Sequence, residues 1–154
     1  MRYILALVAL VLPTSLFAGA LPPSELSIGG ITSGATETSV LKHLGQPTKR
    51  LDAGEGIELH YPGLSVTVGW LEQKTPGRQR RVLALYGTGS KACTPRGLCP
   101  GQPASTADRL YGRTKPVHRE SGTYLEYQPS KTHCWLQVAV KGGVIQSVAV
   151  ACQP

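Results

Sequence analysis

The sequence lacks a hydrophobic run long enough to span a membrane, and it lacks the usual motifs of hydrolases and metalloenzymes. The apolar stretch near its start, residues 4–12, is shorter than the roughly 20 residues that a membrane helix needs. No G-x-S-x-G motif, no H-E-x-x-H motif and no other paired arrangement of its four histidines occurs. We therefore expect no catalytic residues, no metal site and no cofactor, and we predict that the protein is not an enzyme.

One partial motif keeps a hydrolase open as an alternative. Ser39 and Lys42 have the S-x-x-K spacing of penicillin-recognising enzymes, but the S-D-N and K-T-G elements that those enzymes also need are missing. Val40 and Leu41, which lie between them, fit better as the buried face of a helix. Because the S-x-x-K spacing is nevertheless present, a small envelope hydrolase stays an alternative to a protein without catalysis.

The first 20 residues have the features of an export signal. Arg2 precedes the apolar stretch, and Ala18, Gly19 and Ala20 form an A-x-A cleavage site. Cleavage near Ala20 leaves 154 − 20 = 134 residues, a length that suits one compact domain. We predict a periplasmic or secreted protein.

Acidic residues are scarce, because nine Asp and Glu stand against 16 Lys and Arg and give a net charge of +7. Removal of Arg2 with the signal leaves 7 − 1 = +6. Such a charge attracts an acidic protein or an anionic envelope surface at long range. Nucleic acid is excluded as a partner because export removes the chain from the cytoplasm.

All four cysteines lie in the predicted mature chain, and an even number in an exported protein predicts two disulfides. Spacing alone permits three connectivities. A hairpin that turns at residues 142–144 places residues whose numbers sum to 286 opposite each other, so that Cys134 faces Cys152 on the side of the apolar alternation. We therefore predict the pairs Cys134–Cys152 and Cys93–Cys99.

Start and stop signals predict two short helices. Thr36 is placed to cap the first helix, and Glu37 follows it where the helix dipole favours negative charge. Gly45 and then Pro47 end this helix. A second helix is expected over residues 104–111, before Gly112.

Period-2 alternation predicts three strands after each helix. These strands cover residues 57–61, 64–70, 81–86, 124–127, 134–140 and 144–152. Leu125 and Tyr127 match Leu59 and Tyr61 at an offset of 66. The prediction is an α+β fold of two tandem units, each a helix with a three-stranded antiparallel sheet, stapled by disulfides. After the signal peptide at residues 1–20, the units are residues 21–88 and 89–154, together one compact domain.

The first helix region carries the motif G-x-T-x-x-x-V-x-x-x-L-G-x-P, at Gly34, Thr36, Val40, Leu44, Gly45 and Pro47. This motif resembles that of the small outer-membrane assembly lipoproteins of the SmpA/OmlA (BamE-like) family. The doubled arrangement, with a disulfide in each region, is similar to the β-lactamase-inhibitor-protein (BLIP-like) fold. The resemblance implies a non-enzymatic protein that docks a sheet face or loops on another protein.

Two groups of residues are candidates for contact with a partner. The first group lies on the strand positions opposite the apolar alternation, where small residues surround large aromatic ones that are typical of interface hot spots; it comprises Trp135, Gln137, Tyr124 and Tyr86. The second group is basic and lies near the predicted turn at residues 76–77; it comprises Arg78, Arg80 and Arg81.

These features together favour a soluble periplasmic protein-binding module without catalysis. We expect it to act as an inhibitor, an immunity protein or an envelope-assembly accessory, with another protein of the cell envelope, acidic in character, as its partner. The alternative from another class is a binder of an anionic envelope glycan or lipid head group, with the three arginines as the contact residues.

Overall fold

The computed structural model describes residues 21–54, 56–70, 78–129 and 131–153, and most of their regular secondary structure is β-strand. The predicted signal peptide and the predicted turn at residues 76–77 lie outside the described residues. The described helical elements are a 3-10 turn, η1 (Pro23–Glu25), and two α-helices, α1 (Glu37–Leu44) and α2 (Ser105–Tyr111). The strands are β1 (Ser27–Ile28), β2 (Ile31–Thr32), β3 (Lys49–Asp52), β4 (Gly56–Tyr61), β5 (Leu64–Gly69), β6 (Arg81–Gly87), β7 (Val117–Arg119), β8 (Gly122–Tyr127), β9 (Cys134–Lys141) and β10 (Val144–Cys152).

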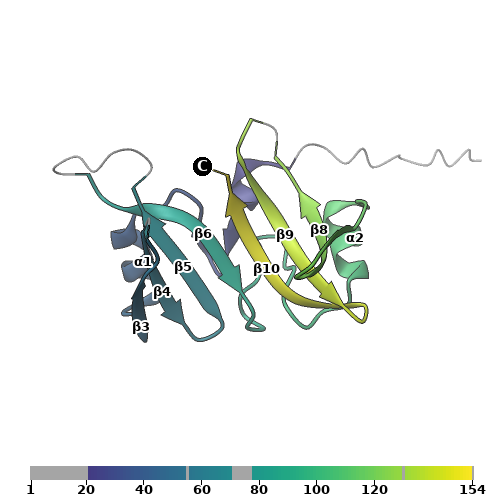
Figure 1. Ribbon diagram of the computed structural model, residues 1–154, viewed down its shortest axis with the longest axis horizontal. Helices are drawn as coiled ribbons and strands as arrows, with labels where there is room; N and C mark the ends of the chain where they lie inside the picture. The colour runs from purple at the N-terminus through teal and green to yellow at the C-terminus, as the bar shows by residue number, and fades with distance from the viewer. Residues whose placement is uncertain (1–20, 55, 71–77, 130, 154) are drawn as a thin grey trace, which may run out of the picture.

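Eight of these strands form one continuous antiparallel sheet, in the order β3-β4-β5-β6-β10-β9-β8-β7, while β1 and β2 form a small sheet of their own (Figure 1). The two halves of the large sheet meet where β6 pairs with β10, with Ala149 opposite Tyr86. The predicted α+β fold of two helix-plus-three-stranded units is therefore wrong. Each predicted three-stranded sheet would have left an unpaired edge, and backbone hydrogen bonds between β6 and β10 satisfy both edges at once.

The prediction also missed the two outermost strands. All four residues of β3 are exposed, and β7 has two exposed residues out of three, so neither strand carries a hydrophobic alternation that a sequence pattern could reveal. Their positions follow from pairing with β4 and β8. The predicted division of the chain at residues 88 and 89 falls between β6 and α2, and it stays a prediction.

Local signals at the helix ends were interpreted correctly. The hydroxyl of Thr36 accepts a hydrogen bond of 3.2 Å from the backbone N–H of Ser39, which caps α1. Gly45 ends α1 with φ 78°, in the left-handed region that glycine adopts without strain. Gly112 ends α2 in the same way.

The two predicted disulfides, Cys93–Cys99 and Cys134–Cys152, are confirmed. The predicted hairpin register is confirmed from the Cys134–Cys152 pair to the pair Ala139–Ser147. Beyond that point a β-bulge shifts the register by one residue, so that Val140 lies opposite Ile145 and not opposite Gln146. The bulge lets Ile145 reach the core, where only 1% of it is exposed.

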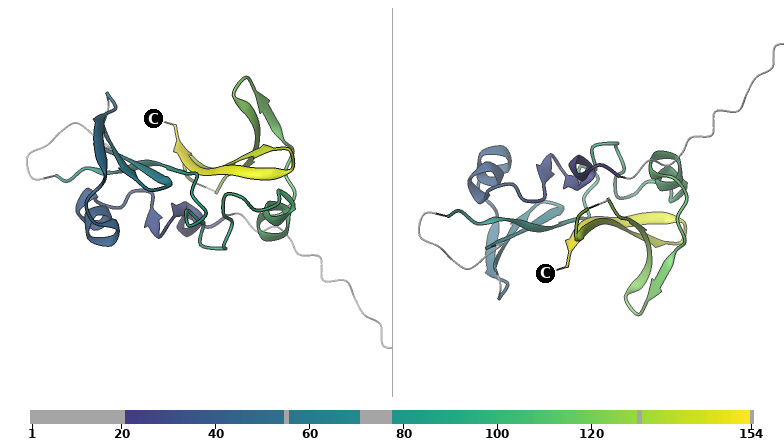
Figure 2. Two further views of the ribbon diagram at one scale, coloured as in Figure 1. Left: turned by 90° about the horizontal axis from the view of Figure 1, so that it is seen from below. Right: turned by 90° about the horizontal axis from the view of Figure 1, so that it is seen from above.

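The core lies on one side of the large sheet, under α1, α2 and the β1–β2 strap, which is residues 21–34 (Figure 2). Strand residues whose side chains face this side, such as Leu59, Val66, Leu136 and Val148, are fully buried. Ile28 of β1 is also fully buried, and β1 packs against both β6 and β10. The strap therefore covers the line where the two halves of the sheet meet.

A buried polar cluster ties η1 to α2. The phenol oxygen of Tyr111 lies 2.9 Å from a carboxylate oxygen of Glu25 and 2.6 Å from the hydroxyl of Thr94. The guanidinium of Arg96 lies 3.3 Å from the other carboxylate oxygen of Glu25 and stacks over the Tyr111 ring. Burial, together with the carboxylate, raises the pKa of Tyr111 above its ordinary value, so this phenol is neutral and donates to Glu25.

Candidate functional site

Among the described residues no helix covers the second face of the large sheet, which we call the open face. The outer strands β3 and β7–β8 bend away from the helices, so the open face is concave (Figure 2). A sheet twisted in its usual right-handed sense curves in this manner. The result is a hollow whose floor is the meeting line of β6 and β10.

One row of side chains crosses the open face from β3 to β8. Each residue of the row lies directly opposite the next across an antiparallel pair, so all of them point to the same side. The row consists of Lys49, His60, Ser65, Tyr86, Ala149, Gln137 and Glu126. Tyr86 stands in the middle of it with 52% of its surface exposed, the most exposed large hydrophobic side chain among the described residues.

The structure brings the four predicted partner-contact residues of the first group onto this face. Tyr124 of β8 lies opposite Ala139 of β9, and Trp135 lies opposite Ala151. An alanine therefore lies opposite each of the three aromatic residues, since Ala149 faces Tyr86. Their role as contact residues stays a prediction.

A carboxylate anchors the polar end of the row. Glu126 accepts a hydrogen bond of 2.8 Å from the amide of Gln137 and lies 2.8 Å from the guanidinium of Arg119. Burial acts to raise the pKa of Glu126, but these two donors outweigh it and hold the pKa below its ordinary value. Within the described part of the chain, the buried indole N–H of Trp135 makes no hydrogen bond of ordinary geometry, and it adds only a weaker attraction to this carboxylate.

Three polar side chains at the other end of the row form a chain of contacts. The hydroxyl of Ser65 lies 3.3 Å from Nδ1 of His60, and Nε2 of His60 lies 3.5 Å from a carboxylate oxygen of Glu58. The second contact is an ion pair only when the ring is protonated, and it does not meet hydrogen-bond geometry. The order of groups is that of a serine, a base and an acid, but both distances exceed those of an activated nucleophile.

The three predicted arginines lie apart from the aromatic group, at the start of β6 and beside α1. Nε of Arg80 lies 2.6 Å from one carboxylate oxygen of Glu37, and Nη2 of Arg50 lies 2.6 Å from the other. Arg81 donates to the backbone carbonyl of Gly34 at 2.9 Å. The basic group is therefore partly neutralised by the fold, which the sequence pattern did not reveal.

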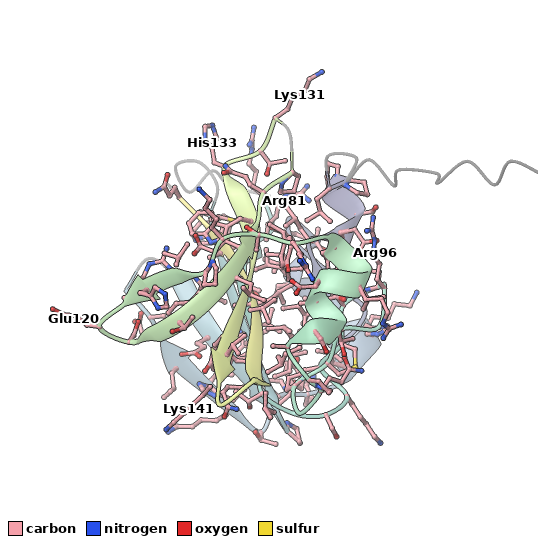
Figure 3. The ribbon with its side chains drawn as sticks, turned by 90° about the vertical axis from the view of Figure 1, so that its right-hand side faces the viewer. Arg81, Arg96, Glu120, Lys131, His133 and Lys141 are labelled. Atoms are coloured by element: carbon pink, nitrogen blue, oxygen red, sulfur yellow. A yellow bond between two sulfur atoms is a disulfide. The ribbon has the colours of Figure 1, made fainter. Side chains whose placement is uncertain are left out.

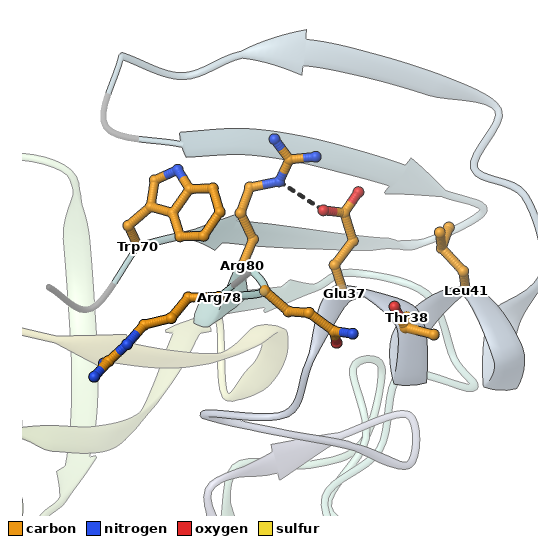
Figure 4. Close-up of a pocket in the computed structure, with 7 residues that line it drawn as sticks. Glu37, Thr38, Leu41, Trp70, Arg78 and Arg80 are labelled. Atoms are coloured by element: carbon orange, nitrogen blue, oxygen red, sulfur yellow. Dashed lines mark hydrogen bonds and ion pairs between the residues drawn. The ribbon is translucent and has the colours of Figure 1, made fainter. Parts of the chain in front are cut away.

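Glu37 and Arg80 line a pocket of about 380 Å³ at the first turn of α1 (Figure 4). The indole of Trp70 lies beside Arg80, while the side chain of Arg78 points away from the ion pair. Burial acts to raise the pKa of Glu37, but the hydrogen bonds from Arg80 and Arg50 outweigh it and lower the pKa. A carboxylate held between two guanidinium groups has a structural role, since it joins α1 to β6 and β3.

Within the described ranges, no group of three or more His, Cys, Asp or Glu side chains is placed to hold a metal ion. In the same ranges, neither helix has the length and apolar character of a membrane span.

Comparisons with known proteins show similarity at the level of fold. No family model matches the chain, and a search of curated proteins finds no match. A DUF4309 family protein from Bacillus subtilis has a TM-score of 0.51 at 12% identity, and the match covers 88% of each chain. An extracellular protein containing a SCP domain from Bacillus anthracis has a TM-score of 0.54 at 12% identity. A cysteine-rich secretory protein from Staphylococcus aureus has a TM-score of 0.50 at 13% identity.

The last two matches cover 79% of this chain but only 44% of those proteins, so this chain spans less than half of their length. These neighbours overturn the predicted resemblance to the SmpA/OmlA (BamE-like) family and to the BLIP-like fold. The motif that suggested this resemblance contains the residues that begin and end one helix, because Thr36 caps α1 and Gly45 ends it. Such capping and terminating residues occur at helix ends in many unrelated folds.

The two disulfides are those of a protein that folds outside the reducing cytoplasm. Both disulfides lie in the second half of the chain. Cys93–Cys99 closes the loop before α2, and Cys134–Cys152 joins the ends of β9 and β10.

Proposed function

We propose that this protein is a secreted or periplasmic binding module that docks another protein on its open face, without catalysis. The observation that carries the proposal is the uncovered concave face of an eight-stranded sheet with the exposed ring of Tyr86 at its centre. Large aromatic side chains at the centre of a patch, surrounded by small or neutral residues, are the usual hot spots of protein interfaces. The predicted export signal, the disulfides and the similarity to extracellular and secretory proteins support the compartment.

The charge of the chain supports an acidic partner. Three of its carboxylates, those of Glu37, Glu126 and Glu25, are held in ion pairs by arginines of the same chain. The excess of 16 Lys and Arg over nine Asp and Glu gives the chain a net charge of +7 and a positive long-range field. Lys49, at the edge of the open face, lies where it meets a partner first.

Site-specific photocrosslinking tests the proposal. A benzoylphenylalanine at position 86 is expected to capture a partner in the envelope, whereas the same group at Ser105, which is exposed on α2, is expected to capture none. With the partner purified, Tyr86→Ala should weaken binding at least about fivefold, because truncation of a central aromatic residue typically costs more than about 1 kcal/mol.

The matched control is Val144→Ala. Val144 is also an exposed large hydrophobic residue, with 39% exposure, but it lies at the β9–β10 turn away from the row. Its replacement should leave affinity unchanged. Equal crosslinking at the two positions, or equal affinity of Tyr86→Ala and the unmodified protein, would refute docking on the open face.

The contact chain of Ser65, His60 and Glu58 favours a hydrolase as the second candidate function. Under that alternative a fluorophosphonate probe labels the protein, and Ser65→Ala abolishes the labelling. Labelling that survives Ser65→Ala, or its complete absence, would contradict it.

A further inference from the structure

The two halves of the large sheet separate at one end of their meeting line and form a fork. Pairing between β6 and β10 ends at Leu85 and Val150, although β6 begins at Arg81 and β10 continues to Cys152. Figure 1 shows the two strands diverging toward this end. Nothing in the sequence pattern predicts this fork.

The segment that leads into α1 holds the fork open. Beyond the fork, Val82 exchanges backbone hydrogen bonds of 2.8 Å with Gly34 and Ala35 and makes none with β10. The backbone N–H of Glu37 then donates to the carbonyl of Arg80 at 2.9 Å. These bonds pair the backbone N–H and C=O groups at this edge of β6, so the strand does not require β10 as a hydrogen-bonding partner here.

A pocket of about 710 Å³ lies in the fork, and we call it the fork pocket. Its volume falls within the range of about 300 to 1,000 Å³ that is usual for small-molecule sites. Val82, Leu83 and Ala84 of β6 line one side, and the Cys134–Cys152 disulfide lines the other. Side chains from both halves of the sheet therefore enclose one largely apolar space.

The polar side chains that line the fork pocket are Ser33, Thr67, His133 and Gln153, besides the indole of Trp70. His133 lines it, and Arg81 lies against its wall because it donates to the carbonyl of Gly34, another lining residue. Figure 3 shows Lys131, His133 and Arg81 at the same end of the molecule. Among the described residues that line the pocket there is no Asp or Glu.

We propose that the fork pocket binds an amphipathic anion, that is, a small molecule with an apolar body and one carboxylate or sulfonate head. The body packs between β6 and the Cys134–Cys152 disulfide, and the head lies toward Arg81 and His133. Burial of the body supplies most of the affinity, because removal of apolar surface from water is the main favourable contribution to such binding. The head selects an anion over a neutral analogue.

Two dyes that differ only in the head test this proposal on the mature full chain. The probe is 8-anilinonaphthalene-1-sulfonate, and its partner is 1-anilinonaphthalene, which lacks the sulfonate. We expect saturable binding of one sulfonate dye per chain. Ala84→Leu, which places a larger side chain in the pocket, should weaken binding of both dyes at least about tenfold, since tenfold corresponds to about 1.4 kcal/mol.

Arg81→Gln should change the affinities of the two dyes differently. It should weaken binding of the sulfonate about threefold to fivefold, the effect expected for one exposed charge pair, and leave the neutral dye unchanged. Ala104→Leu is the matched control, because Ala104 is a half-buried alanine at the start of α2 and does not line the pocket. It should leave the binding of both dyes unchanged.

Protection of a disulfide provides a readout that needs no substitution. The saturating sulfonate dye should slow reduction of Cys134–Cys152 by dithiothreitol, measured by alkylation and mass spectrometry, because the bound dye covers that disulfide. Cys93–Cys99 does not line the pocket, and its reduction rate should not change.

Three outcomes overturn the proposal. They are unchanged dye affinity in a folded Ala84→Leu variant, equal weakening of both dyes by Arg81→Gln, and reduction of Cys134–Cys152 at the same rate with and without dye. If Ala84→Leu fails to fold, the protection experiment on the unmodified chain decides.

Discussion

Replacing Tyr111 by phenylalanine tests whether the buried polar cluster fastens η1 to α2. The substitution removes only the phenol oxygen, which lies 2.9 Å from the Glu25 carboxylate and 2.6 Å from the Thr94 hydroxyl. The ring, its stacking against Tyr127 at 5.2 Å and the contact with Arg96 all remain. Any change in stability therefore reports on the hydrogen bonds.

The expected loss of stability depends on the partners that Glu25 and Thr94 keep after the hydroxyl is removed. Glu25 keeps its ion pair with Arg96, and Thr94 still accepts a bond from the backbone N–H of Leu98, so neither group is left without a partner. The lost bond to a buried carboxylate costs about 2 kcal/mol. For a mature chain of 134 residues, an unfolding entropy of about 0.28 kcal/mol/K converts this into a fall in Tm of about 7 °C.

Tyr127→Phe is a closely matched control. Tyr127 packs against Tyr111 and is equally buried, but among the described residues no group bonds its hydroxyl. Burial, with the charge of Asp108, raises the pKa of Tyr127 to about 12, so this phenol is also neutral. Its removal should leave stability unchanged or raise it by up to about 1 kcal/mol, since an unpaired buried hydroxyl is unfavourable.

Differential scanning calorimetry at pH 7 measures both variants. The reasoning is refuted if the two substitutions shift Tm equally, or if Tyr111→Phe shifts it by less than the error of the measurement. Amide hydrogen exchange gives a second readout, because loss of the fastening should raise exchange within η1 before it raises exchange in β9 or β10.

Two further predictions concern the ion pairs of Glu37 and the Cys134–Cys152 disulfide. Glu37→Gln should lower stability at pH 7 by about 1 kcal/mol, the discounted value for a carboxylate paired with partly exposed arginines. The pKa of Glu37 is lowered in the folded state, so its contribution is present above the unfolded value of about 4.3 and is lost as the pH falls through the folded value. Urea unfolding curves of Glu37→Gln and the unmodified protein should therefore converge in acid, and a gap that persists there contradicts the pairing with Arg80. Replacing Cys134 and Cys152 together by serine should cost about 3 kcal/mol in the loop-entropy model, or about 10 °C in Tm, and an unchanged Tm in calorimetry would show that this staple contributes little.

The parts of the fold that sequence reasoning predicted correctly are set by short-range rules. Capping by Thr36 and termination at Gly45 involve neighbours within one helix turn. The disulfide between Cys134 and Cys152 follows from the alternation along a single hairpin, in which a wrong register would put apolar residues in water. The bulge near Gln146 was not predicted, because it depends on the space that the core leaves for the side chain of Ile145. The alternation of apolar and polar residues does not reveal it.

The candidate site was predictable only in part. Alternation alone placed Trp135, Gln137, Tyr124 and Tyr86 on the face opposite the core. It did not show that the four residues share one concave surface, because that depends on the pairing of β6 with β10. The partner of Arg80 was hidden for a related reason, since Glu37 is 43 positions away in the chain.

The amino-acid sequence by itself determined the two short helices, six of the strands, the turn of the last hairpin and the two disulfides. Each of these depends on residues close together in the chain or on a period that one strand carries. Only the tertiary structure decided that the strands form one sheet, that one face of it lies open and that a fork separates β6 from β10 at one end. The physical reason is that strand edges pair through backbone groups, which every residue except proline carries alike, so the choice between possible edges is made by the packing of the whole chain.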